Sequence, residues 1–159
     1  MLKFQEMELL DKQESFILNS HNTIDYEEVM MILKEFDKEF NPIHSSLVNH
    51  ENYALKLANN AKVITAYYDK TLVAVVFYYE NILKHDIYIT YLCVKSNYRR
   101  FGVSSKIIEF LSESYIPDYQ TISLMVRKDN IPAFDFYQAN EFSILSQTEK
   151  SFLMTKILK

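Results

Sequence analysis

The chain has 159 residues, of which 48% are hydrophobic and 24% charged. This length and balance fit one globular domain with a full core and exclude a disordered chain. Seventeen Lys and Arg side chains against 21 Asp and Glu give a net charge of −4, so the broad positive field typical of a nucleic-acid-binding protein is missing. We therefore expect a single domain over residues 1–159 with a small molecule, and no nucleic acid, as its partner.

The cysteine and histidine content argues against disulfide and metal chemistry. The one cysteine, Cys93, cannot form an internal disulfide, and no charged segment followed by an apolar run comes after Met1, so we expect a cytoplasmic protein. The four histidines show no paired helical spacing, and we expect no metal site. The longest apolar run, 72–79, is far shorter than the about 20 residues that span a bilayer, so we expect no membrane partner.

The first 40 residues predict a helix after an ambiguous start. Within residues 1–22, Phe4, Met7 and Leu10 suit a helix, while residues 14–19 suit a strand. From Asp25, a residue type that caps helices, apolar residues at helical spacing predict a helix up to Phe40, which Pro42 stops.

The rest of the chain alternates strand and helix patterns between turn residues. In order, we expect a loop over 43–46, a helix over 50–59, strands over 62–68, 72–79 and 87–94, a helix that starts at or just after Arg100, a strand over 120–126, a helix over 130–139, and a final pair of strands over 142–145 and 152–158. The strand over 87–94 is apolar on both faces, so it should be central and covered on both sides. Helices after this strand and the next one indicate an α/β fold with a mixed sheet.

The only glycine in the chain, Gly102, lies in a short basic loop between the central strand and the following helix. Glycine serves where the backbone takes a positive φ or approaches a ligand closely. The start of that helix has N–H groups without intrahelical acceptors and a positive dipole end, to which Arg99 and Arg100 add two charges. This pattern favours an anion site, most naturally for a phosphate, although ordinary solvated surface explains the loop equally well on its own.

A second segment strengthens the phosphate interpretation. Residues 99–104 read Arg-Arg-Phe-Gly-Val-Ser, and residues 130–142 read Asn-Ile-Pro-Ala-Phe-Asp-Phe-Tyr-Gln-Ala-Asn-Glu-Phe. The first segment resembles the Arg/Gln-x-x-Gly-x-Gly/Ala pyrophosphate loop of the GNAT superfamily of acyl-CoA-dependent N-acyltransferases. The second resembles that family's Asn-x-x-Ala-x-x-Phe-Tyr-x-x-x-Gly-Phe. The resemblance covers residues 60–158 well and implies a GNAT-type fold, in which the middle strands 87–94 and 120–126 splay apart to admit the cofactor.

The resemblance also implies an activity and a set of site residues. Acetyl-CoA, or another short acyl-CoA, would be the co-substrate, and its acetyl group would pass to the primary amine of a small-molecule acceptor. The implied cofactor contacts are Cys93, Val94, Arg99, Arg100, Phe101, Gly102, Val103, Ser104, Ser105 and Asn130. Tyr137 matches the tyrosine that protonates the departing thiolate. On position alone Tyr137 is a core residue, and either Asp129 or Asn130 is the helix cap; these alternatives stay open.

Three positions depart from the family pattern. Ser104 replaces a Gly or Ala, Glu141 replaces the Gly that ends the second helix, and Tyr88 stands where some protein-modifying members carry a glutamate base. Glu80, His85 and Asp86 lie near that strand but are typical of loops and strand ends, so the general base is unassigned. These departures leave a second hypothesis open, a non-catalytic acyl-CoA-binding or partner-binding domain with the same fold.

The acceptor site has to be sought in the loops, because loops on a rigid scaffold carry specificity. We expect residues 40–47 and 146–150 to form its walls. The start of the first segment, Phe40-Asn41-Pro42, is similar to uncharacterised bacterial GNAT proteins and leads us to consider an amino sugar as the acceptor. The assembly expected is a monomer or a homodimer.

Overall fold

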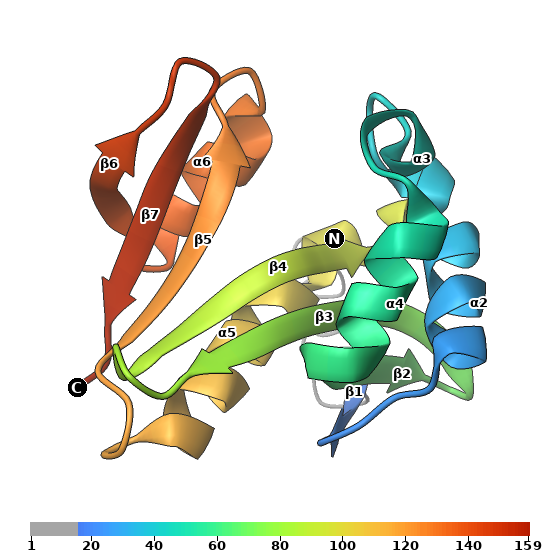
Figure 1. Cartoon of the computed structure of the whole chain (residues 1–159), viewed down its shortest axis with the longest axis horizontal. Helices are drawn as coiled ribbons and strands as arrows, with labels where there is room; N and C mark the ends of the chain where they lie inside the picture. The colour runs from blue at the N-terminus through green and yellow to red at the C-terminus, as the bar shows by residue number, and fades with distance from the viewer. Residues whose placement is uncertain (1–15) are drawn as a thin grey trace, which may run out of the picture. The chain divides into compact units, whose positions relative to one another are not determined.

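The computed structural model describes residues 16–159 (Figure 1). Its elements, in chain order, are β1 (Phe16–His21), α2 (Tyr26–Phe36), the 3₁₀ helix η1 (Asp37–Glu39), α3 (His44–Leu47), α4 (His50–Asn60), β2 (Lys62–Tyr68), β3 (Thr71–Asn81), β4 (Asp86–Val94), the 3₁₀ helix η2 (Ser96–Phe101), α5 (Val103–Tyr115), β5 (Thr121–Arg127), α6 (Ile131–Ala139), β6 (Ser143–Gln147) and β7 (Ser151–Ile157). β1 agrees with the strand alternative for 14–19, and the helix considered near the start lies outside the described residues.

The seven strands form one mixed sheet in the order β1-β2-β3-β4-β5-β7-β6, which confirms the α/β fold and the central place of β4. β4 and β5 are parallel and pair over four positions, from Asp86–Thr121 to Ile89–Leu124. Both strands continue, β4 to Val94 and β5 to Arg127. Within the described chain, the β4–β5 pairing therefore stops after Ile89.

Burial along β4 corrects one expectation. Ile87, Ile89, Tyr91 and Cys93 are buried, but the residues between them, Tyr88, Thr90 and Leu92, are only half-buried. The apolar pattern on both faces predicted full cover on both sides. The prediction was wrong for Tyr88 and Leu92 on the second face and right for Val94, which is buried. Tyrosine has high strand propensity whether or not it is buried, so its presence in a strand does not report cover.

The chain divides into two compact units. Unit 1 comprises the described residues up to Phe77 together with Tyr91–Ile107, and unit 2 comprises Tyr78–Thr90 and Ile108–Lys159. The division falls inside β3, β4 and α5, which continue from one unit into the other. The single domain over 1–159 stays a prediction.

In unit 1, α2 and α4 pack on each other through buried apolar side chains, among them Leu33 and Leu57. Asp25 caps α2, because its carboxylate accepts the N–H of Glu28 at 2.8 Å. β2 and β3 join through a two-residue turn in which Asp69 and Lys70 have φ of 45° and 68°. Two successive positive φ values are typical of the hairpin turn whose twist matches that of the strands.

The segment after α2 differs from the prediction at two points. The α-helix ends at Phe36 and continues as η1, and residues 44–47 form the short helix α3 where we expected a loop. The reason is Asp37, whose carboxylate accepts the N–H of Ser45 at 2.6 Å and its hydroxyl at 2.7 Å. These bonds stabilise the start of α3, and no periodic pattern in the sequence signals them.

In unit 2, α6 ends in a Schellman motif. The N–H of Glu141 donates to the carbonyl of Gln138 at 3.1 Å, and the N–H of Phe142 donates to the carbonyl of Tyr137 at 3.0 Å. Glu141 has φ of 70° and so occupies the left-handed position, whereas Asn140 does not. The rings of Tyr137 and Phe142, 5.4 Å apart, supply the apolar contact of this motif. The glutamate that replaces the family's glycine therefore adopts the glycine conformation.

We expect Glu141→Gly to stabilise the protein by about 1 kcal/mol, because glycine has no Cβ to strain at positive φ. For a chain of this length such a gain raises the melting temperature by about 2–4 °C. Loss of the contact with Lys156 should matter little, since Glu141 is 82% exposed. Glu149→Gly is the control, because Glu149 is exposed and does not have a positive φ. Equal melting temperatures for wild type and Glu141→Gly would show that this position is unstrained.

Candidate functional site

The start of α5 has the geometry expected of an anion site. Gly102 has φ of 75° and ψ of 18° and separates η2 from α5. The N–H of Lys106 donates to the carbonyl of Gly102 at 3.1 Å, which begins the intrahelical bonding. The N–H groups of Val103, Ser104 and Ser105 precede that bond and have no acceptor within the helix. The helix starts three residues later than Arg100, because the left-handed backbone of Gly102 interrupts it.

The two arginines of this loop have different surroundings. Nε of Arg99 donates to the carbonyl of Val94 at 3.0 Å, and Nη2 of Arg99 donates to the Glu39 carbonyl at 2.8 Å and carboxylate at 3.1 Å. Arg100 is exposed, and its guanidinium lies 5.2 Å from the ring of Phe101. No carboxylate of residues 16–159 pairs with Arg100. The structure therefore pairs Arg99 with a carboxylate and leaves Arg100 exposed, so the two arginines contribute differently to this loop.

Most of the other residues expected to contact the cofactor have buried side chains. Phe101 and Val103 are 4% and 1% exposed, so they offer a ligand only their backbones. Cys93 and Val94, at the end of β4, are each 6% exposed. Burial raises the pKa of the Cys93 thiol to about 12, which leaves it protonated and unreactive at neutral pH.

Unit 2 contains Asn130 and Tyr137, the other two residues that the sequence assigned to the site. The side-chain oxygen of Asn130 accepts the N–H of Ala133 at 3.2 Å, so the cap interpretation of Asn130 is confirmed. Tyr137 is half-buried, with its ring 5.2 Å from that of Phe136 and 5.4 Å from that of Phe142. The ring is thus held by aromatic neighbours without being a fully buried core residue.

The three groups weighed as bases near β4 all have partners. Glu80 accepts the hydroxyl of Tyr115 at 2.6 Å. Asp86 accepts the hydroxyls of Thr121 and Ser123 at 2.7 and 2.8 Å. A ring nitrogen of His85 lies 3.2 Å from the carbonyl of Asp118. These side chains stabilise their own surroundings, in agreement with the structural roles expected for them.

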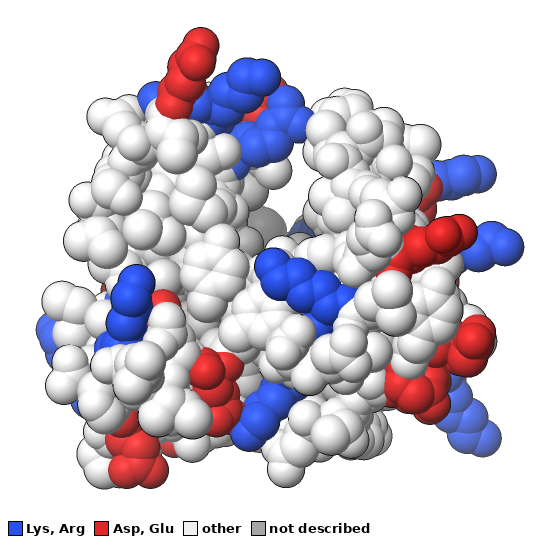
Figure 2. Space-filling view, in the orientation of Figure 1, with Lys and Arg blue, Asp and Glu red and all other residues white. Residues whose placement is uncertain are grey.

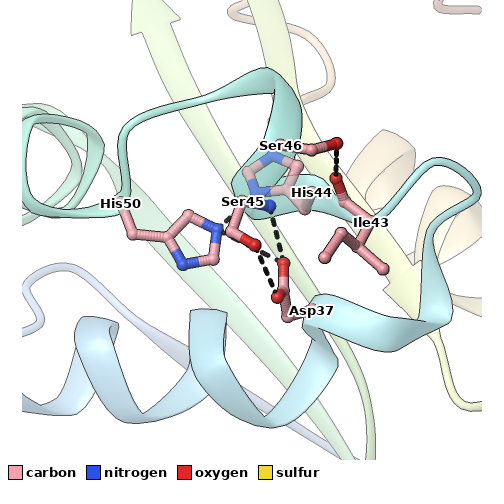
Figure 3. Close-up of polar contacts among 6 residues, drawn as sticks. All are labelled: Asp37, Ile43, His44, Ser45, Ser46 and His50. Atoms are coloured by element: carbon pink, nitrogen blue, oxygen red, sulfur yellow. Dashed lines mark hydrogen bonds and ion pairs between the residues drawn. The ribbon is translucent and has the colours of Figure 1, made fainter.

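A histidine pair that the sequence did not single out involves the segment expected to form an acceptor wall (Figure 3): His44 lies within residues 40–47, and His50 lies three residues beyond them. Nδ1 of His44 is 2.9 Å from Nε2 of His50, and Oδ1 of Asp37 is 3.7 Å from the same His50 nitrogen. Asp37 also holds Ser45, as described above. The six-residue spacing of the two histidines carries no helical signal, because they come from α3 and the next helix, α4.

Aromatic rings enclose His44. The rings of Phe40, Tyr53 and Tyr91 lie 4.9, 5.6 and 5.1 Å from its own, and His44 is 8% exposed. Burial, reinforced by His50 and opposed by Asp37, lowers the pKa of His44 to about 4, so the ring is uncharged at neutral pH. The hydroxyl of Tyr91 is buried and has no hydrogen-bond partner in the described chain. Burial, and to a lesser extent the nearby Cys93, raises the pKa of the Tyr91 hydroxyl.

The charged surface gives no sign of a polyanion-binding face on the side shown in Figure 2, where basic and acidic side chains are interspersed among uncharged ones. No group of three or more His, Cys, Asp or Glu side chains in residues 16–159 could hold a metal ion. None of the helices that these same residues form is long and apolar enough to cross a membrane.

The pH dependence of stability tests the burial of His44. Its pKa is about 4 in the folded state against 6.5 for an ordinary histidine, so only the unfolded chain takes up the proton between these values. The contribution of His44 to stability is therefore full above pH 6.5 and is lost as the pH falls toward 4. We expect the melting temperature of wild type to fall more steeply across this window than that of His44→Gln. His21→Gln, at an exposed site, should keep the wild-type slope, and parallel curves for wild type and His44→Gln would contradict the account.

Comparison with known proteins identifies the family. A sequence profile described as the Acetyltransferase (GNAT) family matches residues 27–142. No curated protein sequence matches the chain. A PaiA N-acetyltransferase from Thermoplasma acidophilum, solved with coenzyme A, has a TM-score of 0.70 at 15% identity and covers 89% of this chain and 99% of its own.

Two further solved structures share the fold. The ribosomal-protein-S18-alanine N-acetyltransferase from Escherichia coli has a TM-score of 0.68 at 14% identity, over 91% of this chain and 94% of its own. A spermidine N-acetyltransferase chimera from Vibrio cholerae and hSSAT has a TM-score of 0.69 at 13% identity, over 91% and 96%. At these identities the likeness is one of fold. The profile matches well over half of the chain, and the chain therefore belongs to the GNAT acetyltransferase family.

Proposed function

We propose that this protein transfers the acetyl group of acetyl-CoA to the primary amine of a small-molecule acceptor. The observation that carries the proposal is the start of α5, where the N–H groups of Val103, Ser104 and Ser105 have no acceptor within the helix. Gly102 has no Cβ, so a phosphate oxygen can approach this backbone closely. The pyrophosphate of the co-substrate is the group that fits such a site.

The pantetheine arm is assigned to the end of β4. β4 pairs with β5 only as far as Ile89 and continues to Val94, which supports the use of the Cys93 and Val94 backbones by a ligand. An amide-containing arm can bind such a backbone as a partial strand does. Asn130 uses its side-chain oxygen as a helix cap, which leaves its amide nitrogen as the group that would contact the cofactor.

Bound acetyl-CoA supplies a thioester whose acetyl carbon the acceptor nitrogen attacks. As the new C–N bond forms and the C–S bond breaks, the hydroxyl of Tyr137 gives its proton to the departing sulfur. The rings of Phe136 and Phe142 hold the Tyr137 ring in place while it does so. The carboxylates of Glu80 and Asp86 already accept hydrogen bonds from hydroxyl groups, so we propose that water accepts the proton of the attacking nitrogen and that the Tyr137 oxygen takes up a proton from water before the next turnover.

The acceptor is assigned to the segment around α3. Asp37 holds this segment through Ser45, and the uncharged His44 lies among its aromatic rings. Amino sugars, polyamines and peptide N-termini are the classes to compare, and release of free thiol from acetyl-CoA in the presence of each class identifies the one that is used.

Tyr137→Phe tests the chemistry. The change keeps the ring and its contacts but deletes the proton, so turnover should fall by the order of 10²–10⁴-fold typical of a lost general acid. Affinity for acetyl-CoA, measured by calorimetry, and the melting temperature should stay close to wild type. Tyr137→Ala is the matched variant, because it also removes the ring packing and should lower the melting temperature.

Two outcomes would contradict the proposal. Wild-type turnover in Tyr137→Phe would leave Tyr137 as a packing residue only. Binding of acetyl-CoA by wild type without thiol release for any amine would instead favour a non-catalytic acyl-CoA-binding domain.

A further inference from the structure

Arg99 and Arg100 are adjacent in the loop that we assign to the pyrophosphate, yet their side chains make different contacts. Arg99 is bound to Val94 and Glu39, whereas Arg100 is exposed beside Phe101. We propose that Arg99 is a positioning residue that fixes the Val94 carbonyl for the pantetheine arm, and that Arg100 alone supplies side-chain charge to the phosphates. This inference rests on the proposed function, because it concerns how the same co-substrate is held.

Glu39 determines where Arg99 points. Its carboxylate accepts Nη2 of Arg99 at 3.1 Å and the N–H of Ser96 at 3.0 Å, and its carbonyl accepts Nη2 of Arg99 at 2.8 Å. A neighbouring pair, Lys95 Nζ and Glu35 at 2.6 Å, joins the same two segments. Nε and both hydrogens of Nη2 are thus committed to protein acceptors. Only the two hydrogens of Nη1 remain for another group, and the Glu39 carboxylate offsets the charge of this guanidinium, so Arg99 offers less to a phosphate than Arg100 does.

The Val94–Lys95 peptide is fixed at both of its polar groups. Its carbonyl accepts Nε of Arg99 at 3.0 Å, and its N–H, that of Lys95, donates to the carbonyl of Val73 at 2.8 Å. A carbonyl oxygen has two lone pairs, so the Val94 carbonyl can accept a second hydrogen bond while Arg99 occupies the first. An amide N–H of the pantetheine arm would therefore meet an acceptor that is already oriented, at little entropic cost to the protein.

We expect the fold to tolerate removal of the pair between Arg99 and Glu39. The Arg99 and Glu39 side chains are 51% and 21% exposed, and an ion pair that reaches solvent in this way contributes little to stability. We therefore expect Arg99→Ala to melt close to wild type. Binding measurements on this variant then report on the ligand site.

The test compares two ligands and two variants by calorimetry. Coenzyme A carries both the pantetheine arm and the pyrophosphate, while ADP carries the pyrophosphate without the arm. Arg99→Ala should lower the affinity for coenzyme A by about tenfold, the effect of one well-formed hydrogen bond, and leave the affinity for ADP unchanged. Arg100→Ala should lower the affinity for both ligands by a similar factor. It should also reduce the salt dependence of binding, because it removes a charge that faces phosphate.

Two further variants separate positioning from charge. Arg99→Lys keeps the charge but not the planar fork, so it should not restore the affinity for coenzyme A. Glu39→Gln keeps an acceptor of the same shape and should bind coenzyme A more tightly than Glu39→Ala, with ADP unaffected in both. If Arg99→Ala unfolds, these Glu39 variants give the same comparison with Arg99 in place.

Two kinds of result would overturn the inference. If Arg99→Ala lowered the affinities for ADP and coenzyme A equally, Arg99 would be a phosphate ligand. If it changed neither affinity, Arg99 would have no role in binding. Failure of the proposed function looks different, since wild type would then bind neither ligand. In that case the assignment of Arg99 falls with it.

Discussion

The left-handed backbone of Gly102 is the constraint on which the proposed cofactor site depends. It ends η2 and begins α5, so that the first N–H groups of α5 face no carbonyl of their own helix. Positive φ alone does not explain why glycine stands there. The same chain places Asp69, Lys70, His85 and Glu141 at positive φ without using glycine. Close approach of another group to the backbone is the remaining reason to keep glycine at 102, and an anion at a helix start provides it.

Local patterns in the sequence predicted most of the fold. The caps Asp25 and Asn130 are where the sequence placed them, because a capping side chain binds an N–H only three residues away. The central place of β4 followed from its apolar residues, although the extent of its cover did not. The end of α2 and the presence of α3 could not be predicted, since they depend on Asp37 reaching Ser45, eight residues ahead.

The candidate site was predictable in its backbone and less so in its side chains. The position of Gly102 and the free N–H groups after it follow from spacing and from helix geometry. The partners of Arg99 do not, because Glu39 lies 60 residues earlier in the chain. The pair of His44 and His50 was missed for a related reason. Its environment consists of rings from separate elements, and their convergence is a property of the packed structure.

The most direct test of the account is the response of the backbone N–H groups at the start of α5 to coenzyme A, measured residue by residue in amide NMR spectra. The account predicts large shifts for Val103, Ser104 and Ser105, because these groups would form new hydrogen bonds to phosphate oxygens. Asn52 at the start of α4, whose N–H is already bound by the Asn49 side chain at 3.0 Å, should not shift. Binding of coenzyme A that leaves the α5 amides unchanged would contradict the assignment of the pyrophosphate to this loop.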